Sequence, residues 1–185
     1  MRSTLIRNSS VFAVLLAATV ASAHPKGFHK KVIITVTQTR VSALVVMDVD
    51  SGDRCLLLRE AVDADRNGEL AGDEVAKLRD RVTKMATSAL KLGLSGAPLP
   101  LQLKDSKLSL RDDKRANDSP LSVAILMELD HPHEISESMT LEFTDTSPDQ
   151  STIVLQVFQE GMAGAPFEAE VKSGVKTKVP LTFGR

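Results

Sequence analysis

Hydrophobic and polar residues alternate with a period of two over much of this chain. Residues 31–50, "KVIITVTQTRVSALVVMDVD", are rich in Val, Ile and Thr, and Thr35, Thr37 and Thr39 alternate with their neighbours. This pattern predicts β-structure, because side chains on a strand point alternately to its two faces. The segment is expected to form either one long bent strand or a hairpin that turns at residues 38–40.

Residues 98–183 repeat this pattern in several short runs. The β-like runs are "PLPLQLK", "KLSLR", "LSVAILMEL", "SMTLEFTD" and "TIVLQVFQE", and the third, which is the most apolar, is predicted to be a central strand. Between them lie "DDKRANDSP", "DHPHEIS" and "TSPDQS", whose Pro, Asp, Asn and Ser favour turns. The last run, "PFEAEVKSGVKTKVPLTF", is interrupted at Ser173 and Gly174, which predicts a hairpin. We expect about seven or eight strands.

The period changes to that of a helix between the two β-rich parts. Residues 54–62 predict a short helix, and residues 74–92 predict a longer amphipathic one that stops at Gly93. The apolar positions of the second helix recur at steps of three and four: Val75, Leu78, Val82, Met85, Ala89 and Leu92. The predicted fold class is therefore α+β, an antiparallel β-sandwich or open barrel with one inserted helix–loop–helix at about residues 54–92.

The first 23 residues have the pattern of a signal peptide. Arg2 and Arg7 precede an apolar run at residues 11–20, and Ala21 and Ala23 are the small residues expected before a cleavage site. We expect cleavage after Ala23, a single β-rich domain at residues 24–185 with no transmembrane segment, and a periplasmic or secreted location. The alternative is an uncleaved membrane anchor. The polar residues 24–31 are expected to form a mobile arm.

Composition excludes several classes of function. Without its first 23 residues the chain has 21 basic and 24 acidic side chains, which gives no reason to expect a nucleic-acid partner. Trp and Tyr are absent and Phe is sparse, so the aromatic platforms of carbohydrate and single-strand binders are not available. The lone Cys55 excludes an internal disulfide and is expected to be a small buried side chain on a helix.

The segment "DADRNGELAGDE", residues 63–74, carries the main candidate chemistry. Calcium prefers six to eight hard oxygen ligands, and a twelve-residue loop can wrap one ion with oxygens from positions 1, 3, 5, 7, 9 and 12. Asp63, Asp65 and Asn67 occupy positions 1, 3 and 5, and Gly68 at position 6 permits a sharp bend. Glu69 offers its backbone carbonyl, and Glu74 at position 12 supplies two oxygens. Ala71 at position 9 has no side-chain oxygen, so a water is expected there.

This segment resembles the calcium-binding loop of the EF-hand family, because all diagnostic positions of D-x-D-x-N-G-x-L-x-x-x-E agree. The resemblance covers about thirty residues, the loop and its flanking helices, and none of the β-rich remainder. It implies one Ca²⁺ held by Asp63, Asp65, Asn67, the Glu69 carbonyl and Glu74, with Asp73 outside the ligand set. Magnesium fits less well because it demands tight octahedral geometry. An exposed polar turn that caps a helix is the alternative.

EF-hands usually pair through a short β-bridge at position 8, but this chain has no complete second loop. "DVDSGDRCLLLR", from Asp48, has Arg59 where the final acid is needed, and "DDKRANDSPLSV" lacks both the glycine and the final acid. We therefore expect Leu70 at position 8 to pack on the β domain, on a degenerate neighbouring loop or on another chain.

The four histidines, His24, His29, His131 and His133, are a second candidate metal site. Imidazoles suit copper and nickel, and cleavage after Ala23 would leave His24 with a free amine. The alternative function is therefore a periplasmic copper or nickel carrier. A hydrolase with an accessory calcium loop is a third possibility, but no nucleophile–base motif supports it.

The leading hypothesis is an exported, non-enzymatic protein that binds one calcium ion at residues 63–74. The ion would either be structural or order the helices for a partner, such as an envelope or membrane protein.

Overall fold

A computed structural model of the protein describes residues 28–111, 113–130, 135–136, 138–147, 153–161 and 164–183. Its helices are α1 (Asp53–Glu60) and α2 (Gly72–Thr87). Its strands are β1 (Phe28–Val36), β2 (Arg40–Val49), β3 (Leu90–Leu94), β4 (Ala97–Pro98), β5 (Gln102–Ser109), β6 (Leu121–Asp130), β7 (Thr140–Asp145), β8 (Ile153–Gln159), β9 (Phe167–Val171) and β10 (Thr177–Pro180).

The strands form two sheets, in the orders β5-β6-β2-β1-β8-β9 and β10-β7-β3-β4. The predicted class, an α+β protein built on a β-sandwich or open barrel, is confirmed. One pair departs from the antiparallel pattern, since β1 and β8 are parallel. The chain runs through β7 in the other sheet before β8, so β8 joins β1 by a crossover and not by a hairpin. The apolar run at residues 121–129 lies in β6, which is an interior strand as predicted.

The first hairpin turns where the sequence predicts it. Strands β1 and β2 pair from Val36↔Val41 to Phe28↔Val49. Thr37 closes the turn, because its Oγ1 accepts a hydrogen bond from the Arg40 amide at 3.0 Å. The predicted polar arm was wrong for residues 28–31, which belong to β1. These residues form a strand because Phe28 and Lys30 are buried in the core, while the residues next to them are less buried.

The bounds of the second helix, the C-terminal hairpin and the number of strands also differ from the predictions. The second helix begins two residues earlier than expected and ends at Thr87, and residues 90–94 form β3 paired with β7. Leu92 therefore belongs to a strand and not to the second helix. The predicted hairpin at Ser173 and Gly174 is wrong, because β9 pairs with β8 while β10 pairs with β7 in the other sheet. The described residues contain ten strands, against the seven or eight expected: β3 begins in the range predicted as helix, and the runs "PLPLQLK" and "KLSLR" contribute to one strand, β5.

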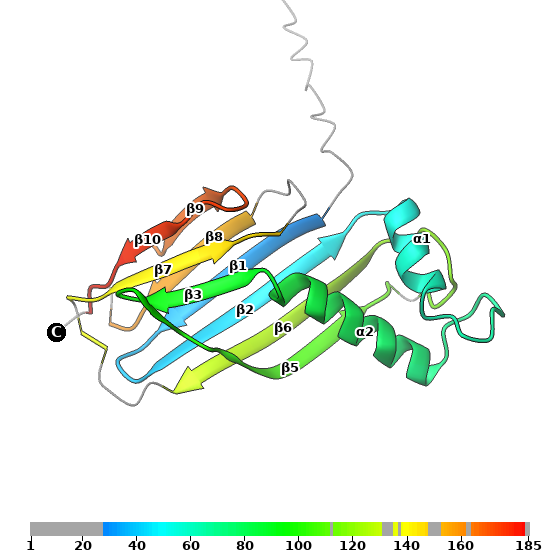
Figure 1. The fold of residues 1–185 in the computed structure, drawn as a ribbon, viewed down its shortest axis with the longest axis horizontal. Coiled ribbons are helices and arrows are strands. Elements are labelled where there is room, and N and C mark those ends of the chain that lie inside the picture. The colour runs from blue at the N-terminus through cyan, green and yellow to red at the C-terminus, as the bar shows by residue number, and fades with distance from the viewer. Residues whose placement is uncertain are drawn as a thin grey trace, which may run out of the picture.

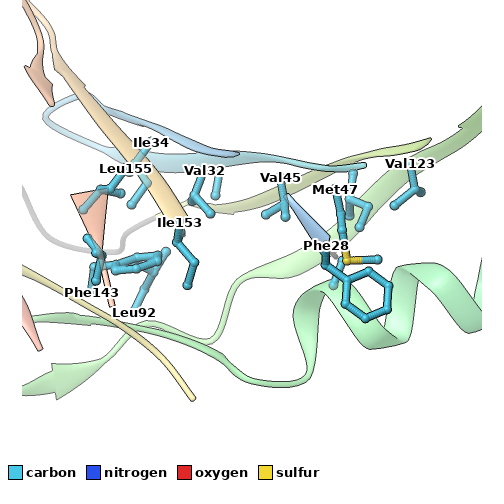
Figure 2. Packing of buried hydrophobic residues seen from close by; sticks show 14 of the residues in the cluster. Phe28, Val32, Ile34, Val45, Met47, Leu92, Val123, Phe143, Ile153 and Leu155 are labelled. Carbon is cyan, nitrogen blue, oxygen red and sulfur yellow. The ribbon is translucent and has the colours of Figure 1, made fainter. Parts of the chain in front are cut away.

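One hydrophobic cluster draws on both sheets and both helices. Figure 1 shows the four-stranded sheet and α2 on the same face of the six-stranded sheet, with α2 crossing β2, β5 and β6. In Figure 2, Val32, Ile34 and Leu155 point toward Phe143 and Leu92 of the opposite sheet. Helix α2 contributes Leu78, Val82 and Ala86, which are fully buried. The helix–loop–helix is thus attached to the sandwich through α2.

A buried ion pair joins the two sheets. Lys30 Nζ of β1 lies 2.7 Å from Asp145 Oδ2 of β7, and the two side chains are 2% and 0% exposed. Lys30 also donates to Ser147 Oγ at 3.0 Å, and the Ser147 amide donates to Asp145 Oδ1 at 2.8 Å. Although burial opposes ionisation, the hydrogen bonds from Lys30 and Ser147 hold the pKa of the Asp145 carboxyl below its ordinary value.

Stability should therefore fall in acid. The folded state favours ionised Asp145, so its contribution is fully present above the ordinary aspartate pKa of about 3.9 and is lost as the pH falls through the lower folded pKa. Denaturant unfolding measured from pH 6 down to 2 (about the range in which carboxyls titrate) checks this. The acid limb of an Asp145→Asn variant should be less steep than that of the unmodified protein. Equal slopes would show that this carboxylate does not contribute.

Several expectations lie outside the described residues: the signal peptide at residues 1–23, His24, His131 and His133. Within the described part of the chain, neither helix has the length and hydropathy needed to cross a membrane.

Candidate metal centre

The 63–74 segment is the loop between α1 and α2, at one end of the sandwich (Figure 1). Two residues give it its tight course. Arg66 has a φ of 56° and Gly68 a φ of 79°, both in the left-handed region. Gly68 adopts this conformation without the penalty that a Cβ would bring, which is the role predicted for position 6. The loop therefore turns back on itself where an ion-wrapping loop must bend.

Three predicted ligands converge. One oxygen from each of the Asp63, Asp65 and Glu74 carboxylates lies within 4.8 Å of the others. Asp63 is half-buried, Asp65 is exposed and Glu74 is 4% exposed. Carboxylates at this separation repel one another unless a cation or hydrogen-bond donors lie among them. Their arrangement is compatible with a hard divalent cation.

The Glu74 carboxylate closes the loop from its last position. Oε1 accepts a hydrogen bond from the Ala64 amide at 2.7 Å, and Oε2 accepts one from the Ala71 amide at 2.9 Å. The second of these bonds also caps the first turn of α2, which begins at Gly72. Because each carboxylate oxygen has a second lone pair, both can still accept a ligand bond.

Hydrogen bonds between residues two positions apart connect Asp65, Asn67 and Glu69. Asp65 accepts from the Asn67 amide at 3.1 Å and from Asn67 Nδ2 at 2.7 Å. Asn67 Oδ1 accepts from the Glu69 amide at 2.6 Å. Asp73 lies apart from this group and faces Lys77 at 3.4 Å, as expected of a residue outside the ligand set.

Asp63 holds an unsatisfied buried oxygen. Its Oδ2 accepts from the Gly68 amide at 3.0 Å, but its Oδ1 is buried and has no hydrogen-bond partner in the described part of the chain. A buried ionised oxygen without a partner costs about 1–3 kcal/mol or more, and a cation that lies against it offsets this cost. This oxygen comes from the residue at position 1 of the loop, so the donor set fits a bound cation.

The apolar residue at position 8 is buried, and its backbone is bonded to a neighbouring loop of the same chain. Leu70 is 3% exposed, and its amide donates to the Lys114 carbonyl at 2.7 Å. The Ala116 amide donates to the Gly68 carbonyl at 2.8 Å, so that Glu69 and Arg115 form an isolated antiparallel bridge. The Leu70 side chain thus belongs to the core cluster that includes the sheets, while its backbone pairs with the degenerate neighbouring loop. The "DDKRANDSPLSV" segment lacks the ligands of a second hand but supplies the bridge.

Sequence reasoning missed Arg59, which the fold brings to this neighbouring loop. Arg59 lies in the last turn of α1 and is fully buried. Its only signal in the sequence is a basic residue beside Leu58 in a helix, which does not distinguish it from a surface arginine.

Two other candidate groups have structural surroundings. Cys55 in α1 is fully buried, as predicted, and donates to the Asp50 carbonyl at 3.2 Å. Burial raises the pKa of its thiol, which disfavours the reactive thiolate. His29 Nε2, on β1, lies 3.0 Å from Oδ2 of Asp50, which directly follows β2. His29 is the one member of the predicted histidine site that lies within the described residues.

No protein-family model matches the chain, and no curated protein matches it significantly.

Proposed function

We propose that this protein binds one calcium ion in the 63–74 loop, through Asp63, Asp65, Asn67, the Glu69 carbonyl and Glu74. The observation that carries the proposal is the convergence of three carboxylates around Asp63, whose buried Oδ1 has no donor in the described residues. A hard cation would remove the repulsion between these carboxylates and compensate the buried oxygen at once.

The donor set selects the class of ion. All candidate ligand atoms are oxygens, and the loop contains neither His nor Cys. Oxygen ligands favour calcium, magnesium or manganese over copper, nickel or zinc. A flexible loop whose last carboxylate can bind through two oxygens suits calcium better than magnesium. Magnesium demands near-ideal octahedral geometry and retains its waters.

The role that the fold supports best is structural, with no part in catalysis. Helix α1 contributes the buried Cys55 and Leu58, and α2 contributes Leu78, to the same core as the sheets. Both helices contribute to the core, and the loop is bridged to residues 114–116. This packing favours a structural role over a change in the angle between the two helices. The ion would tie α1, the loop and α2 together and stabilise the folded state by mass action.

An exported location is consistent with this role. The pattern of residues 1–23 supports a periplasmic or secreted protein, where calcium is plentiful. Extracellular calcium modules work with a Kd of about 10⁻⁴ to 10⁻³ M. We therefore expect an affinity in that range.

Calorimetric titration of the purified protein with calcium should show one site. With calcium at about 100 times the Kd, binding adds about 2.7 kcal/mol to the free energy of unfolding. For a chain of this size that corresponds to a rise in melting temperature of roughly 5–10 °C over the value in EDTA. Magnesium at the same concentration should produce a smaller rise. If calcium at about 10 mM (about ten times the upper expected Kd) produced neither heat nor a thermal shift, the proposal would be excluded.

A further inference from the structure

Residues 113–120, here called the partner loop, are hydrogen-bonded to residues at both ends of α1. At the start of α1, the Gly52 amide donates to the Asp118 carbonyl at 2.9 Å. At its end, Arg59 Nη1 donates to the carbonyls of Asp113 and Arg115, both at 2.7 Å. The partner loop is therefore bonded to α1 near its start and near its end.

Backbone carbonyls accept from both Nη atoms of the Arg59 guanidinium, while its buried Nε has no partner among the described residues. Its Nη2 donates to the Ser119 carbonyl at 3.1 Å and makes a longer contact of 3.5 Å with the Pro120 carbonyl. A buried cation is costly unless its donors are paired, and the planar fork of arginine can reach several carbonyls that a lysine ammonium cannot. The partner loop thus requires arginine at this position.

The partner loop is also organised from within. The Asp113 carboxylate accepts hydrogen bonds from the side chains of Arg115, Asn117 and Ser119, and from the Arg115 amide. These bonds, with those from the Arg115 side chain first, hold the pKa of Asp113 well below its ordinary value. At neutral pH the carboxylate is a fixed acceptor at the centre of the partner loop.

Arg59 connects this loop to the first calcium ligand. Its backbone carbonyl accepts from the Asp63 amide at 3.1 Å, while its side chain holds the carbonyls of residues 113 and 115. The same partner loop then bonds to Gly68 and Leu70 in the middle of the calcium loop. Position 1 and positions 6 to 8 are therefore held by one continuous network that passes through Arg59.

We propose that Arg59 is a positioning residue for the calcium site: through the partner loop it holds the 63–74 loop in its ion-binding course without contacting the ion. This inference rests on the proposed calcium function. The partner loop takes the place of the second hand in a paired site, although it supplies no ligand. Ordering a loop costs conformational entropy, and a network that orders it in advance removes that cost from binding.

The test compares Arg59→Lys with Arg79→Lys by calcium calorimetry. Arg79 lies on α2 and pairs only locally with Asp80 at 2.9 Å, so this control makes the same chemical change away from the network. Arg59→Lys retains the positive charge and loses the forked hydrogen bonds. We expect the Kd of Arg59→Lys to rise on the order of tenfold, as for outer residues that orient metal ligands, and that of Arg79→Lys to stay unchanged.

A second variant and a second readout separate positioning from general stability. Asp113→Asn removes the charged acceptor of the partner loop, and it should also raise the Kd, by a smaller factor. Circular dichroism in EDTA identifies a temperature at which each variant is folded, and the Kd is compared there. If Arg59→Lys does not fold, Asp113→Asn decides the result.

The outcomes are distinct. Calcium binding by the unmodified protein, weakened in both network variants and not in the control, supports the inference. Binding that is unchanged in folded Arg59→Lys or Asp113→Asn would overturn the positioning role and leave the calcium site in place. An absence of binding by the unmodified protein would overturn the proposed function, and this inference with it.

Discussion

A Glu74→Gln variant is expected to bind calcium at least about a hundredfold more weakly than the unmodified protein. Outer residues that only orient a metal ligand typically cost 10–100-fold in affinity, and Glu74 would contribute two ligand oxygens directly. Gln presents one oxygen and no negative charge to the ion. Calorimetric titration measures the change in Kd, and the calcium-induced rise in melting temperature should nearly disappear.

Glu74 has a second role that the measurement must separate. In the absence of an ion its two oxygens accept from the Ala64 and Ala71 amides, and Gln can satisfy only one of them with an oxygen. The variant should therefore be less stable even in EDTA, by about 1 kcal/mol for the loss of one part-buried hydrogen bond. The quantity to compare is the difference between melting temperatures with calcium and with EDTA, which removes this contribution.

Asp73→Asn is the matched control. Asp73 directly precedes Glu74, and its substitution removes the same charge. Its exposed side chain faces Lys77 and not the carboxylate cluster. Its Kd should rise by no more than a few-fold through long-range charge alone. If both variants weakened binding equally, net charge and not ligation would explain the affinity, and the assignment of Glu74 as a ligand would be wrong.

An Asp145→Asn variant should lose about 3–5 kcal/mol of the free energy of unfolding. The substitution leaves the Lys30 ammonium buried between the two sheets without its counter-charge, and the two side chains are almost fully inaccessible to water. For a chain of this size the melting temperature should fall on the order of 10 °C. Guanidinium unfolding followed by circular dichroism gives the free energy directly.

The chain contains a matched exposed pair. Asp130 accepts from Arg40 Nε at 2.8 Å, but the two side chains are 77% and 52% exposed, so Asp130→Asn should cost less than about 1 kcal/mol. Replacing both buried partners, as Lys30→Met with Asp145→Leu, should recover most of the loss, since removing a whole buried pair is often neutral. A loss in Asp145→Asn no greater than in Asp130→Asn would contradict the structural role of the buried pair.

Period-two patterns predicted most of the strands because their physical basis is local. In β1 and β2 the inward residues alternate strictly with outward ones, and the turn at Thr37 needs only residues close in sequence. The end of α2 could not be predicted in this way. Leu92 continues the helical period of Leu78 and Val82, and only the pairing of residues 90–94 with β7 makes them a strand.

The candidate ligands could be named from the sequence because their spacing lies within one twelve-residue loop. Asp63, Asp65 and Glu74 converge as that spacing requires. The residues that hold the loop could not be found, since the relevant partners are about fifty residues apart in the chain. Nothing near Arg59 indicates that it would meet the carbonyls of residues 113 and 115.

The sequence by itself determined most of the strands, the helix–loop–helix and the oxygen donors of the 63–74 loop, because each depends on contacts between near neighbours. Only the tertiary structure decided the parallel pairing of β1 with β8, the buried pair of Lys30 with Asp145 and the bridge from the loop to residues 114–116. These features join segments that are distant in sequence, and their free energy comes from burial and hydrogen bonds that exist only once both sheets are assembled.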